Sequence, residues 1–306
     1  MKDLTSCFSN HAVRVADLAC SRSNTVINRY TFAAPNMNSQ LNGCTVTSTY
    51  ITRLTSKEEI LIRFTWSWNH EGSCLTIKLD DQLYNNSSKR MNSHTMSVQL
   101  SREKNGNWTF TWSSYTVNFY WDMTAAVYNK SPEPISGFNV FMYINSEIVL
   151  LLGEVTKGCL NQVDLVGTAP LAQTVMISRK EHVHGLTSYT TKARFHPADN
   201  DHKICINYEA DKKRFSVNVD EKLAVHATKL NWNFRGNQTI FFEKTMVDVM
   251  WNLHGWLHGG DSAQDPECAW FMFRARSSLD EWLWQVEDGA THSSFIFTIE
   301  VFKGQD

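Results

Sequence analysis

Apolar and polar residues alternate with a period of two along many segments of this chain. Between Ile60 and Trp68, every second residue is isoleucine, phenylalanine or tryptophan, and the alternation recurs at Leu75–Leu79 and Tyr115–Trp121. Successive side chains of a β-strand point to opposite faces of a sheet, so this pattern places one set on a buried face. Threonine, valine and aromatic residues, which strands favour, are abundant in these segments. The chain is therefore predicted to be mainly β.

Several pairs of these segments are predicted to form β-hairpins. The clearest turn is Asn145-Ser146, because asparagine tolerates the positive φ that tight turns require. Two further turns are expected at Asp220-Glu221-Lys222 and at Glu243-Lys244. The predicted hairpins are Phe138–Gly153, Arg214–Val219 with Leu223–Phe234, and Thr239–Phe242 with Met246–Leu253, and further strands are expected at Ala269–Ala275 and Ser294–Val301.

Helical signals are few, at Asp3–Ala19 and at Ser277–Val286. Roughly a dozen or more strands with few crossover helices indicate antiparallel, lipocalin-like β-barrel or β-sandwich units rather than a parallel sheet covered by helices. A chain of 306 residues is large for one simple barrel. We therefore predict two abutting units, residues 1–165 and 166–306, with one continuous domain as the alternative. No exact internal repeat is visible.

Charge and hydropathy argue against several classes of partner. Charged residues make up 20% of the chain and give a net charge of −2, whereas a duplex-binding protein needs a basic surface. No polybasic run suggests an anionic membrane, and the longest aliphatic run, Ile148–Leu152, is far shorter than a membrane span. Met1–Cys20 lacks the apolar stretch of a secretion signal. We expect a cytoplasmic protein, with the nucleus as the alternative, that binds neither nucleic acid nor membrane.

The sequence contains no complete catalytic or cofactor motif. It has no nucleophile elbow, dinucleotide-binding glycine pattern, P-loop, HExxH or kinase signature. No CxxC pair is present, so in a reducing compartment the cysteines are expected to be free thiols. We therefore predict no cofactor and no metal. The cysteines are Cys7, Cys20, Cys44, Cys74, Cys159, Cys205 and Cys268.

Several long segments resemble a plant-specific family known as domain of unknown function 868. The strongest similarity is LNWNFRGNQTIFFE followed by VDVMWNLHGWL, within Leu230–Leu257. WDMTAAVY, PEPISGF and SEIVLLLG, within Trp121–Leu152, are also similar to the family. The remaining similar segments are MKDLTSCFS at Met1–Ser9, SRKEHVHGLTSYTTKARF at Ser178–Phe195 and AWFMFRARSSLDEWLW at Ala269–Trp284.

The resemblance implies a plant source and a β-rich, lipocalin-like fold, but no assigned reaction from which catalytic residues could be transferred. The chain also departs from the family. Members tend to have aspartate where this chain has Asn252 and glycine where it has Ser131, and the stretch Asn36–Thr111 is divergent. We interpret the chain as a specialised paralogue, for which an acquired activity is more expected than for a typical member.

The first candidate for chemistry is the pair His182 and His184. Residues i and i+2 of a strand share a face, so the two imidazoles could hold a metal jointly, or one could act as a general base. Two ligands do not define a metal site. His254 and His258 would be further ligands if that segment were helical. The alternative is that His182 is a structural hydrogen-bonding residue and that His184 lies on a turn before Gly185.

The second candidate is the polar segment from Trp232 to Gln238. Strand alternation would place Asn231, Asn233 and Arg235 on one face. The guanidinium of Arg235 suits a carboxylate or phosphate, and Gly236 permits a close backbone approach or a bulge. The alternative is a corner in which Arg235 pairs with a nearby acid and holds the turn.

A third candidate is the polar face of the next strand, formed by Asp248, Met250, Asn252 and His254. A buried polar row must be paired or hydrated, so this face lines a ligand cavity or is simply the solvent side. The eleven tryptophans supply aromatic walls for a ligand, although most are expected in the core.

The main functional hypothesis is a β-barrel protein of plant specialised metabolism that encloses a small, partly apolar metabolite. It would rearrange this metabolite as a cofactor-independent isomerase or cyclase through general acid–base chemistry. The alternatives are a non-enzymatic ligand carrier or protein-interaction scaffold, and a sugar-binding protein. The predicted catalytic residues are His182 and Arg235, and the predicted substrate-binding residues are Asn233, Trp232, Trp121, Asp248, His254 and Trp251. The oligomeric state is not specified by the sequence.

Overall fold

The structure is a computed structural model. The residues that it describes are 43–81, 93–154, 169–185, 187–196, 200–242, 245–259, 267–276 and 295–303. One short helix, α2 (His254–His258), is among these residues, and no described helix is long and apolar enough to cross a membrane. The strands are β1 (Thr45–Arg53), β2 (Glu59–Asn69), β3 (Gly72–Asp81), β4 (Ser93–Gln99), β5 (Asn105–Trp112), β6 (Tyr115–Asp122), β7 (Val127–Tyr128), β8 (Pro134–Ser136), β9 (Asn139–Ile144), β10 (Glu147–Gly153), β11 (Gln173–His184), β12 (Ser188–Ala193), β13 (His202–Glu209), β14 (Arg214–Val219), β15 (Lys222–Ala227), β16 (Arg235–Phe242), β17 (Thr245–Asn252), β18 (Cys268–Ala275) and β19 (Ile296–Phe302).

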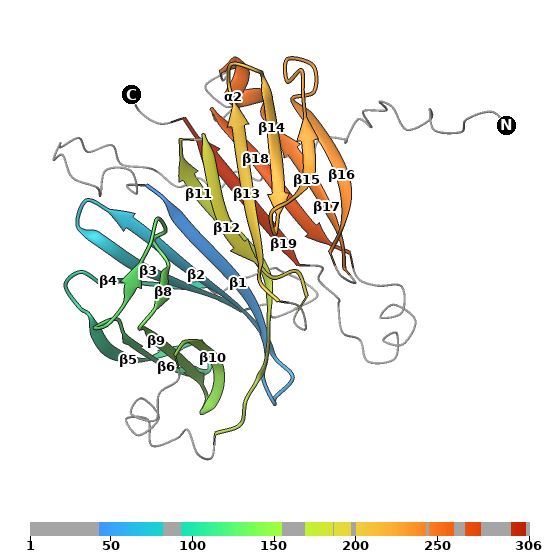
Figure 1. Ribbon diagram of the computed structural model, residues 1–306. Coiled ribbons are helices and arrows are strands. Elements are labelled where there is room, and N and C mark those ends of the chain that lie inside the picture. The colour runs from blue at the N-terminus through green and yellow to red at the C-terminus, as the bar shows by residue number, and fades with distance from the viewer. Residues whose placement is uncertain are drawn as a thin grey trace.

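A nine-stranded sheet runs through the whole molecule in the order β16-β17-β18-β19-β11-β1-β2-β3-β4 (Figure 1). All of its strand pairs are antiparallel except β11 with β19, which is parallel. Strand β11 therefore joins the strands from the first part of the chain to those from its C-terminal part. This sheet makes the two parts structurally continuous.

Two four-stranded sheets cover one face of the nine-stranded sheet. Sheet β10-β9-β6-β5 packs on β1–β4, where the rings of Phe64 and Phe119 lie 6.2 Å apart. Sheet β12-β13-β14-β15 packs on β16–β19, where the rings of Phe215 and Phe271 lie 5.3 Å apart (Figure 1). We call β1–β10 the first unit and β12–β19 the second unit. Each unit is an open β-sandwich with its own hydrophobic core.

Both cores lie on the same face of the nine-stranded sheet. Val46 belongs to the first core and pairs across strands with Glu181 of β11. Val183, two residues after Glu181 on the same face of β11, belongs to the second core. Glu181 therefore lies at the seam where the two sandwiches meet. The division into domains at residues 165 and 166 remains a prediction.

The hairpins follow from their turn residues. Asn145 and Ser146 have φ values of 48° and 68° and connect β9 to β10, as predicted. Asp220 and Glu221, at 47° and 70°, connect β14 to β15, also as predicted. Strands β16 and β17 pair as expected, although the predicted turn Glu243-Lys244 lies outside the described residues.

The two units repeat one hairpin in detail. Gly106 of β5 pairs with Trp121 of β6, and Gly236 of β16 pairs with Trp251 of β17. In both hairpins the indole lies so close to the glycine that an added Cβ would overlap it. The indole nitrogen of each tryptophan donates a hydrogen bond to a backbone carbonyl in the preceding loop, at 2.9 and 3.2 Å. The predicted close approach at Gly236 is confirmed, and its counterpart is Gly106.

The two hairpins can be aligned residue by residue, without a gap, when Gly106 is matched with Gly236 and Trp121 with Trp251. Thr109 donates a hydrogen bond of 2.8 Å to the side chain of Asn118, and Thr239 donates one of 2.8 Å to Asp248. The first unit is thus related to the second by an internal structural repeat. Identical pairs in this alignment are Leu100/Leu230, Gly106/Gly236, Asn107/Asn237, Thr109/Thr239, Val117/Val247 and Trp121/Trp251.

The prediction of a mainly β, largely antiparallel fold is confirmed. One strand boundary is corrected, because β15 ends at Ala227 and residues 228–234 form a loop with turns rather than the end of a strand. The predicted helices at Asp3–Ala19 and Ser277–Val286 lie outside the described residues, as do Cys7, Cys20 and Cys159. Among the described cysteines, Cys74 and Cys205 are free thiols, as predicted, and Cys44 and Cys268 are buried.

Candidate functional site

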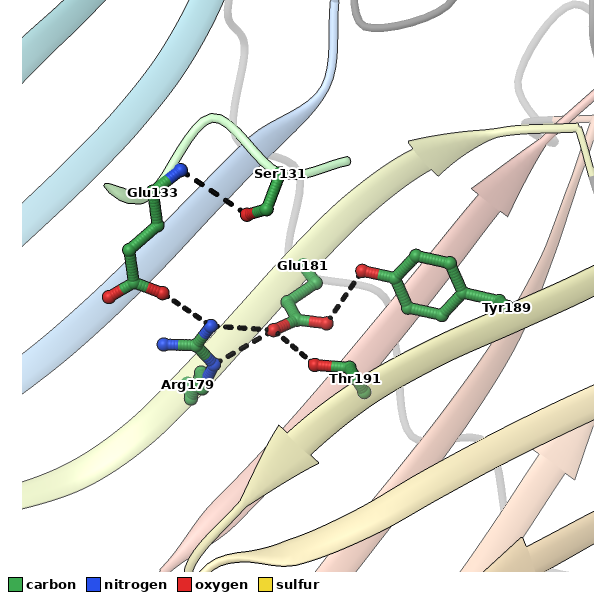
Figure 2. Close-up of polar contacts among 6 residues, drawn as sticks. All are labelled: Ser131, Glu133, Arg179, Glu181, Tyr189 and Thr191. Carbon is green, nitrogen blue, oxygen red and sulfur yellow. Dashed lines mark hydrogen bonds and ion pairs between the residues drawn. The ribbon is translucent and has the colours of Figure 1, made fainter. Parts of the chain in front are cut away.

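A polar network occupies the seam between the two units (Figure 2). Its centre is Arg179 of β11, whose Nη2 lies 2.6 Å from a carboxylate oxygen of Glu133 and 2.7 Å from one of Glu181. Arg179 and Glu181 are two residues apart on one strand, so strand alternation places both on the inner face. Glu133 belongs to the loop between β7 and β8 of the first unit. The network therefore joins both units through one guanidinium.

Glu181 is 1% exposed and accepts hydrogen bonds from two hydroxyl groups as well. Tyr189 donates to it at 2.8 Å and Thr191 at 2.9 Å, both from β12 of the second unit (Figure 2). Burial and the nearby carboxylate raise the pKa of Tyr189. Burial alone would lower the pKa of Arg179, but the two carboxylates outweigh it and raise that pKa.

These contacts hold the Glu181 carboxylate by both of its oxygens. Its Oε1 accepts hydrogen bonds from two nitrogens of Arg179 and from Thr191, and its Oε2 accepts one from Tyr189. The carboxylate is buried, is paired with a guanidinium and lines neither of the two pockets described below. We conclude that this network, which we call the seam network, holds the two units together rather than reacting with a ligand.

A pocket of about 480 Å³ lies at one end of the first unit. It is formed by the turn between β2 and β3, the loop between β4 and β5, and the loop after β6. We call it the first-unit pocket. Trp68 and Tyr128 form an aromatic wall, with their rings 5.8 Å apart at an interplanar angle of 80°.

Polar side chains surround this aromatic wall. His70, Glu71, Ser73 and Lys104 line the pocket, and the hydroxyls of Ser73 and Tyr128 lie 3.5 Å apart. Glu71 also pairs with Arg102 at 3.3 Å, which positions the acid at the rim. An apolar wall with a few polar groups around it is typical of small-molecule sites.

A second pocket, of about 420 Å³, lies at the corresponding end of the second unit. It is formed by the turn between β13 and β14 and the loop between β15 and β16, which are the counterparts of two of the first pocket's segments. We call it the second-unit pocket. Its lining includes Trp232, one of the residues predicted to bind substrate, together with Lys213 and Lys229.

His182 lies on the outer face of the nine-stranded sheet, opposite to Glu181. Its Nε2 is 3.4 Å from Glu300, and its ring stacks on Phe302 at 5.7 Å. Burial lowers the pKa of His182, and the charge of Glu300 only partly opposes this effect. His184 shares the same face, as predicted, and its ring also contacts that of Phe302. The described residues contain no group of three or more His, Cys, Asp or Glu side chains that could hold a metal.

Arg235 is the first residue of β16 and also points to the outer face. Its Nε donates a hydrogen bond of 3.1 Å to Asn252, and its guanidinium lies 5.8 Å from the centre of the Phe234 ring. Asn233 lies in the preceding loop, where its side chain donates to the carbonyl of Thr228 at 2.8 Å. The expected shared strand face of Asn233 and Arg235 is therefore not formed, because the strand begins only at Arg235.

The predicted polar face of β17 is formed by Asp248, Met250 and Asn252, and it is the outer face of the sheet. His254 was expected on this face as well, but the strand ends at Asn252 and His254 lies in helix α2. On the outer face, Asp248 accepts hydrogen bonds from Thr239, Arg274 and Arg276. Burial opposes ionisation of Asp248, but the bonds from Arg276 and Thr239 outweigh it and lower its pKa. Asp248 is therefore fully engaged by its neighbours.

The remaining predicted residues are distributed over both units. Trp121 is buried in the first core, whereas Trp251 packs against the second core. His254 begins helix α2, and its ring lies 5.2 Å from that of His258, so the two histidines do have helical spacing. Phe234 contacts both rings, at 5.3 and 6.0 Å. The assignment of catalytic and substrate-binding roles to these residues remains a hypothesis.

Two groups of residues, the seam network and the lining of the first-unit pocket, were not predicted from the sequence. The seam network was signalled by charged residues at Arg179 and Glu181, in the same alternation as the apolar Val183. The first-unit pocket was signalled by the aromatic and titratable residues Trp68, His70 and Glu71 at the end of a predicted strand. Neither pattern predicts which distant segment of the chain contributes the other residues of the site.

Comparisons with known proteins place the chain in a family without assigning it a function. No curated protein matches it significantly. Among solved structures it is similar to kievitone hydratase from Nectria haematococca, with 8% sequence identity, coverage of 79% of this chain and 88% of that chain, and a TM-score of 0.25. This similarity is too weak to transfer a fold or an activity. The model of the family described as plant protein of unknown function (DUF868) matches residues 42–302, and the chain therefore belongs to this family.

Proposed function

We propose that this protein binds a small, partly apolar metabolite in the first-unit pocket. The observation that carries the proposal is the aromatic wall of Trp68 and Tyr128 inside a pocket of about 480 Å³. Pockets of roughly 300–1,000 Å³ lined by aromatic groups with a few polar side chains suit such ligands. Ser73, Lys104 and His70 supply the polar groups that would orient the ligand.

Native mass spectrometry of protein purified from its own tissue tests this proposal. The wild-type protein is expected to retain a small molecule, and Trp68→Ala is expected to lose it because the aromatic wall is removed. Trp270→Ala is the matched control, since Trp270 lies on β18 outside this pocket. A wild-type protein without ligand, or equal retention by both variants, would contradict the proposal.

The enzymatic form of the proposal is a cofactor-independent isomerase or cyclase. Such a reaction needs a proton-transferring side chain beside the ligand. The pocket offers the imidazole of His70 and the hydroxyl of Tyr128, whereas His182 and Arg235 do not line it. Incubating the released ligand with fresh protein separates these assignments. Loss of turnover in His70→Gln or Tyr128→Phe supports the pocket, and loss only in His182→Ala supports the outer face.

The non-enzymatic alternative is a ligand carrier. It predicts that the retained molecule leaves the protein chemically unchanged, even after long incubation. The same mass measurement distinguishes the two forms, because an isomerase or cyclase changes the retention time or fragmentation pattern of its ligand. Binding in the first-unit pocket is common to both.

A further inference from the structure

The end of the second unit that corresponds to the first-unit pocket has a different chemistry. One backbone contact is shared by both units: the N–H of Leu100 donates to the carbonyl of Ser73, and that of Leu230 donates to the carbonyl of Lys213. The turn that follows the preceding strand is longer in the second unit. The residue that accepts this hydrogen bond lines the pocket in both units, and it carries a hydroxyl in the first unit and an amine in the second.

Three lysines line the second-unit pocket, against one acid, Asp211. Lys212 is paired with Glu209 at 2.7 Å. Lys213 and Lys229 form no ion pair with any residue that the structure describes. Two unpaired amines beside one small pocket make it a favourable place for an anionic group.

The aromatic part of this pocket is Trp232, which is 84% exposed. Its position is set by the loop, since the backbone N–H groups of Trp232 and Asn233 both donate to the carbonyl of Lys229. Exposure leaves a large apolar surface in water, which is favourable to cover. An indole presents a flat face on which a ring of a ligand can stack.

Both unpaired lysines have left-handed backbone conformations. Lys213 has a φ of 47° and Lys229 a φ of 54°, a region that glycine adopts readily and a lysine does not. Both conformations belong to turns: the N–H of Lys213 donates to the carbonyl of Ala210, and the carbonyl of Lys229 accepts hydrogen bonds from the loop that follows it. Glycine could form the same turns, so replacing either lysine by glycine removes the amine while keeping the backbone.

We propose that the second-unit pocket is a separate binding site for a flat ring that carries a carboxylate or phosphate group. Lys213 and Lys229 bind the anionic group, and Trp232 stacks on the ring. Asn231 and Thr228 line the same pocket and offer hydrogen-bonding groups to the ligand. The pocket, at about 420 Å³, suits one small molecule rather than a polymer.

Isothermal titration calorimetry of the full chain with four probes tests this site. Benzoate and phenyl phosphate carry both a ring and an anionic group, phenol carries only the ring, and inorganic phosphate carries only the charge. We expect benzoate, phenyl phosphate or both to bind at least about tenfold more tightly than phenol and inorganic phosphate. Their affinity should fall as salt is added. The comparison of benzoate with phenyl phosphate identifies which anionic group is preferred.

Substitutions separate binding from folding. Lys213→Gly and Lys229→Gly are each expected to weaken binding about tenfold while the melting temperature stays the same or rises, because glycine relieves the strained φ. Trp232→Ala should weaken binding of the ring-bearing probes, whereas its effect on inorganic phosphate should be small. Lys192→Gln is the control, since Lys192 is an exposed lysine of β12 outside the pocket.

Four results would overturn this inference. The first is that the four probes bind with equal affinity or not at all, and the second is that the lysine variants bind as well as the wild type. The third is a Lys192→Gln variant that loses binding as strongly as the Lys213 and Lys229 variants should. The fourth is loss of probe binding in Trp68→Ala, because the probes would then occupy the first-unit pocket.

Discussion

Tyr189 donates a hydrogen bond of 2.8 Å to the carboxylate of Glu181, and this contact joins β12 of the second unit to the strand that runs between both units. Through Arg179, the same carboxylate is connected to Glu133 of the first unit. The two sandwiches share the nine-stranded sheet, and this buried ionic contact also joins β12 to the loop between β7 and β8. It gives the seam a polar cross-link where each core ends.

Replacing Glu181 by glutamine should destabilise the protein strongly. The change removes one of the two carboxylates that balance the buried guanidinium of Arg179, and breaking a buried ion pair of this kind costs about 3–5 kcal/mol. Urea denaturation followed by tryptophan fluorescence measures the loss. Tyr189→Phe keeps the charges and removes one hydrogen bond, so it should cost only about 1 kcal/mol. Equal losses in the two variants would show that the ion pair contributes nothing beyond that bond.

Replacing Gly236 by alanine should destabilise the second unit by about 1–3 kcal/mol, because the new methyl group overlaps the indole of Trp251. Gly106→Ala should have a similar effect in the first unit, where Trp121 occupies the equivalent place. Thermal unfolding measures both. Trp251→Leu removes the indole that the new methyl group overlaps. Gly236→Ala should therefore lower the free energy of unfolding less in a Trp251→Leu protein than in the wild type. An additive pair would contradict the close contact.

The stability of the protein at acidic pH should depend on Asp248. Its pKa is lower in the folded chain than in the unfolded chain, so the unfolded state takes up a proton first as the pH falls. The stabilising contribution of the carboxylate is thus fully present above pH ~4 and decreases as the pH falls through the lowered pKa of the folded state. Asp248→Asn should destabilise the protein by about 1 kcal/mol at pH 7, and this difference should shrink as the pH falls below ~4.

Denaturation curves of wild type and Asp248→Asn at several pH values check this expectation. Asp201→Asn is the control, since Asp201 pairs with Arg194 on the exposed surface. A difference between wild type and Asp248→Asn that stays constant from pH 7 to pH 3 would contradict the assignment to ionised Asp248.

His182 should contribute to a loss of stability between neutral and mildly acidic pH. Its pKa is lower in the folded protein than in the unfolded chain, so protonation favours unfolding once the pH falls below about 6.5. His182→Gln should therefore lose less stability than the wild type between pH 7.5 and pH 5. His226→Gln, a change on the exposed surface of β15, is the control. Identical pH profiles for wild type and His182→Gln would rule out this contribution.

Much of the local structure was predictable from the sequence. The alternation from Ile60 to Trp68 predicted β2, and the turn residues Asn145 and Asp220 predicted two hairpins. Such features depend on neighbours a few residues apart, which the sequence displays directly. The close approach at Gly236 was anticipated for the same reason, since a glycine within a strand indicates a missing side chain.

The candidate sites were less predictable, because each one joins segments that are distant in the chain. Asn233 and Arg235 were expected on one strand face, but the strand begins only at Arg235. Asn233 belongs instead to the preceding loop, where its backbone N–H donates to the carbonyl of Lys229. Trp68 and Tyr128 have no sequence pattern in common. They meet because the turn after β2 and the loop after β6 lie at the same end of the first unit.

The sequence by itself determined that the chain is built from strands, where most of them run and where the tight turns fall, because side-chain alternation and turn preferences are local properties. The tertiary structure alone decided that β11 pairs with β1 on one side and in parallel with β19 on the other. This pairing places Glu181 at the seam and His182 on the outer face. Strand order depends on how two cores are buried together, and no segment of the chain carries that information on its own.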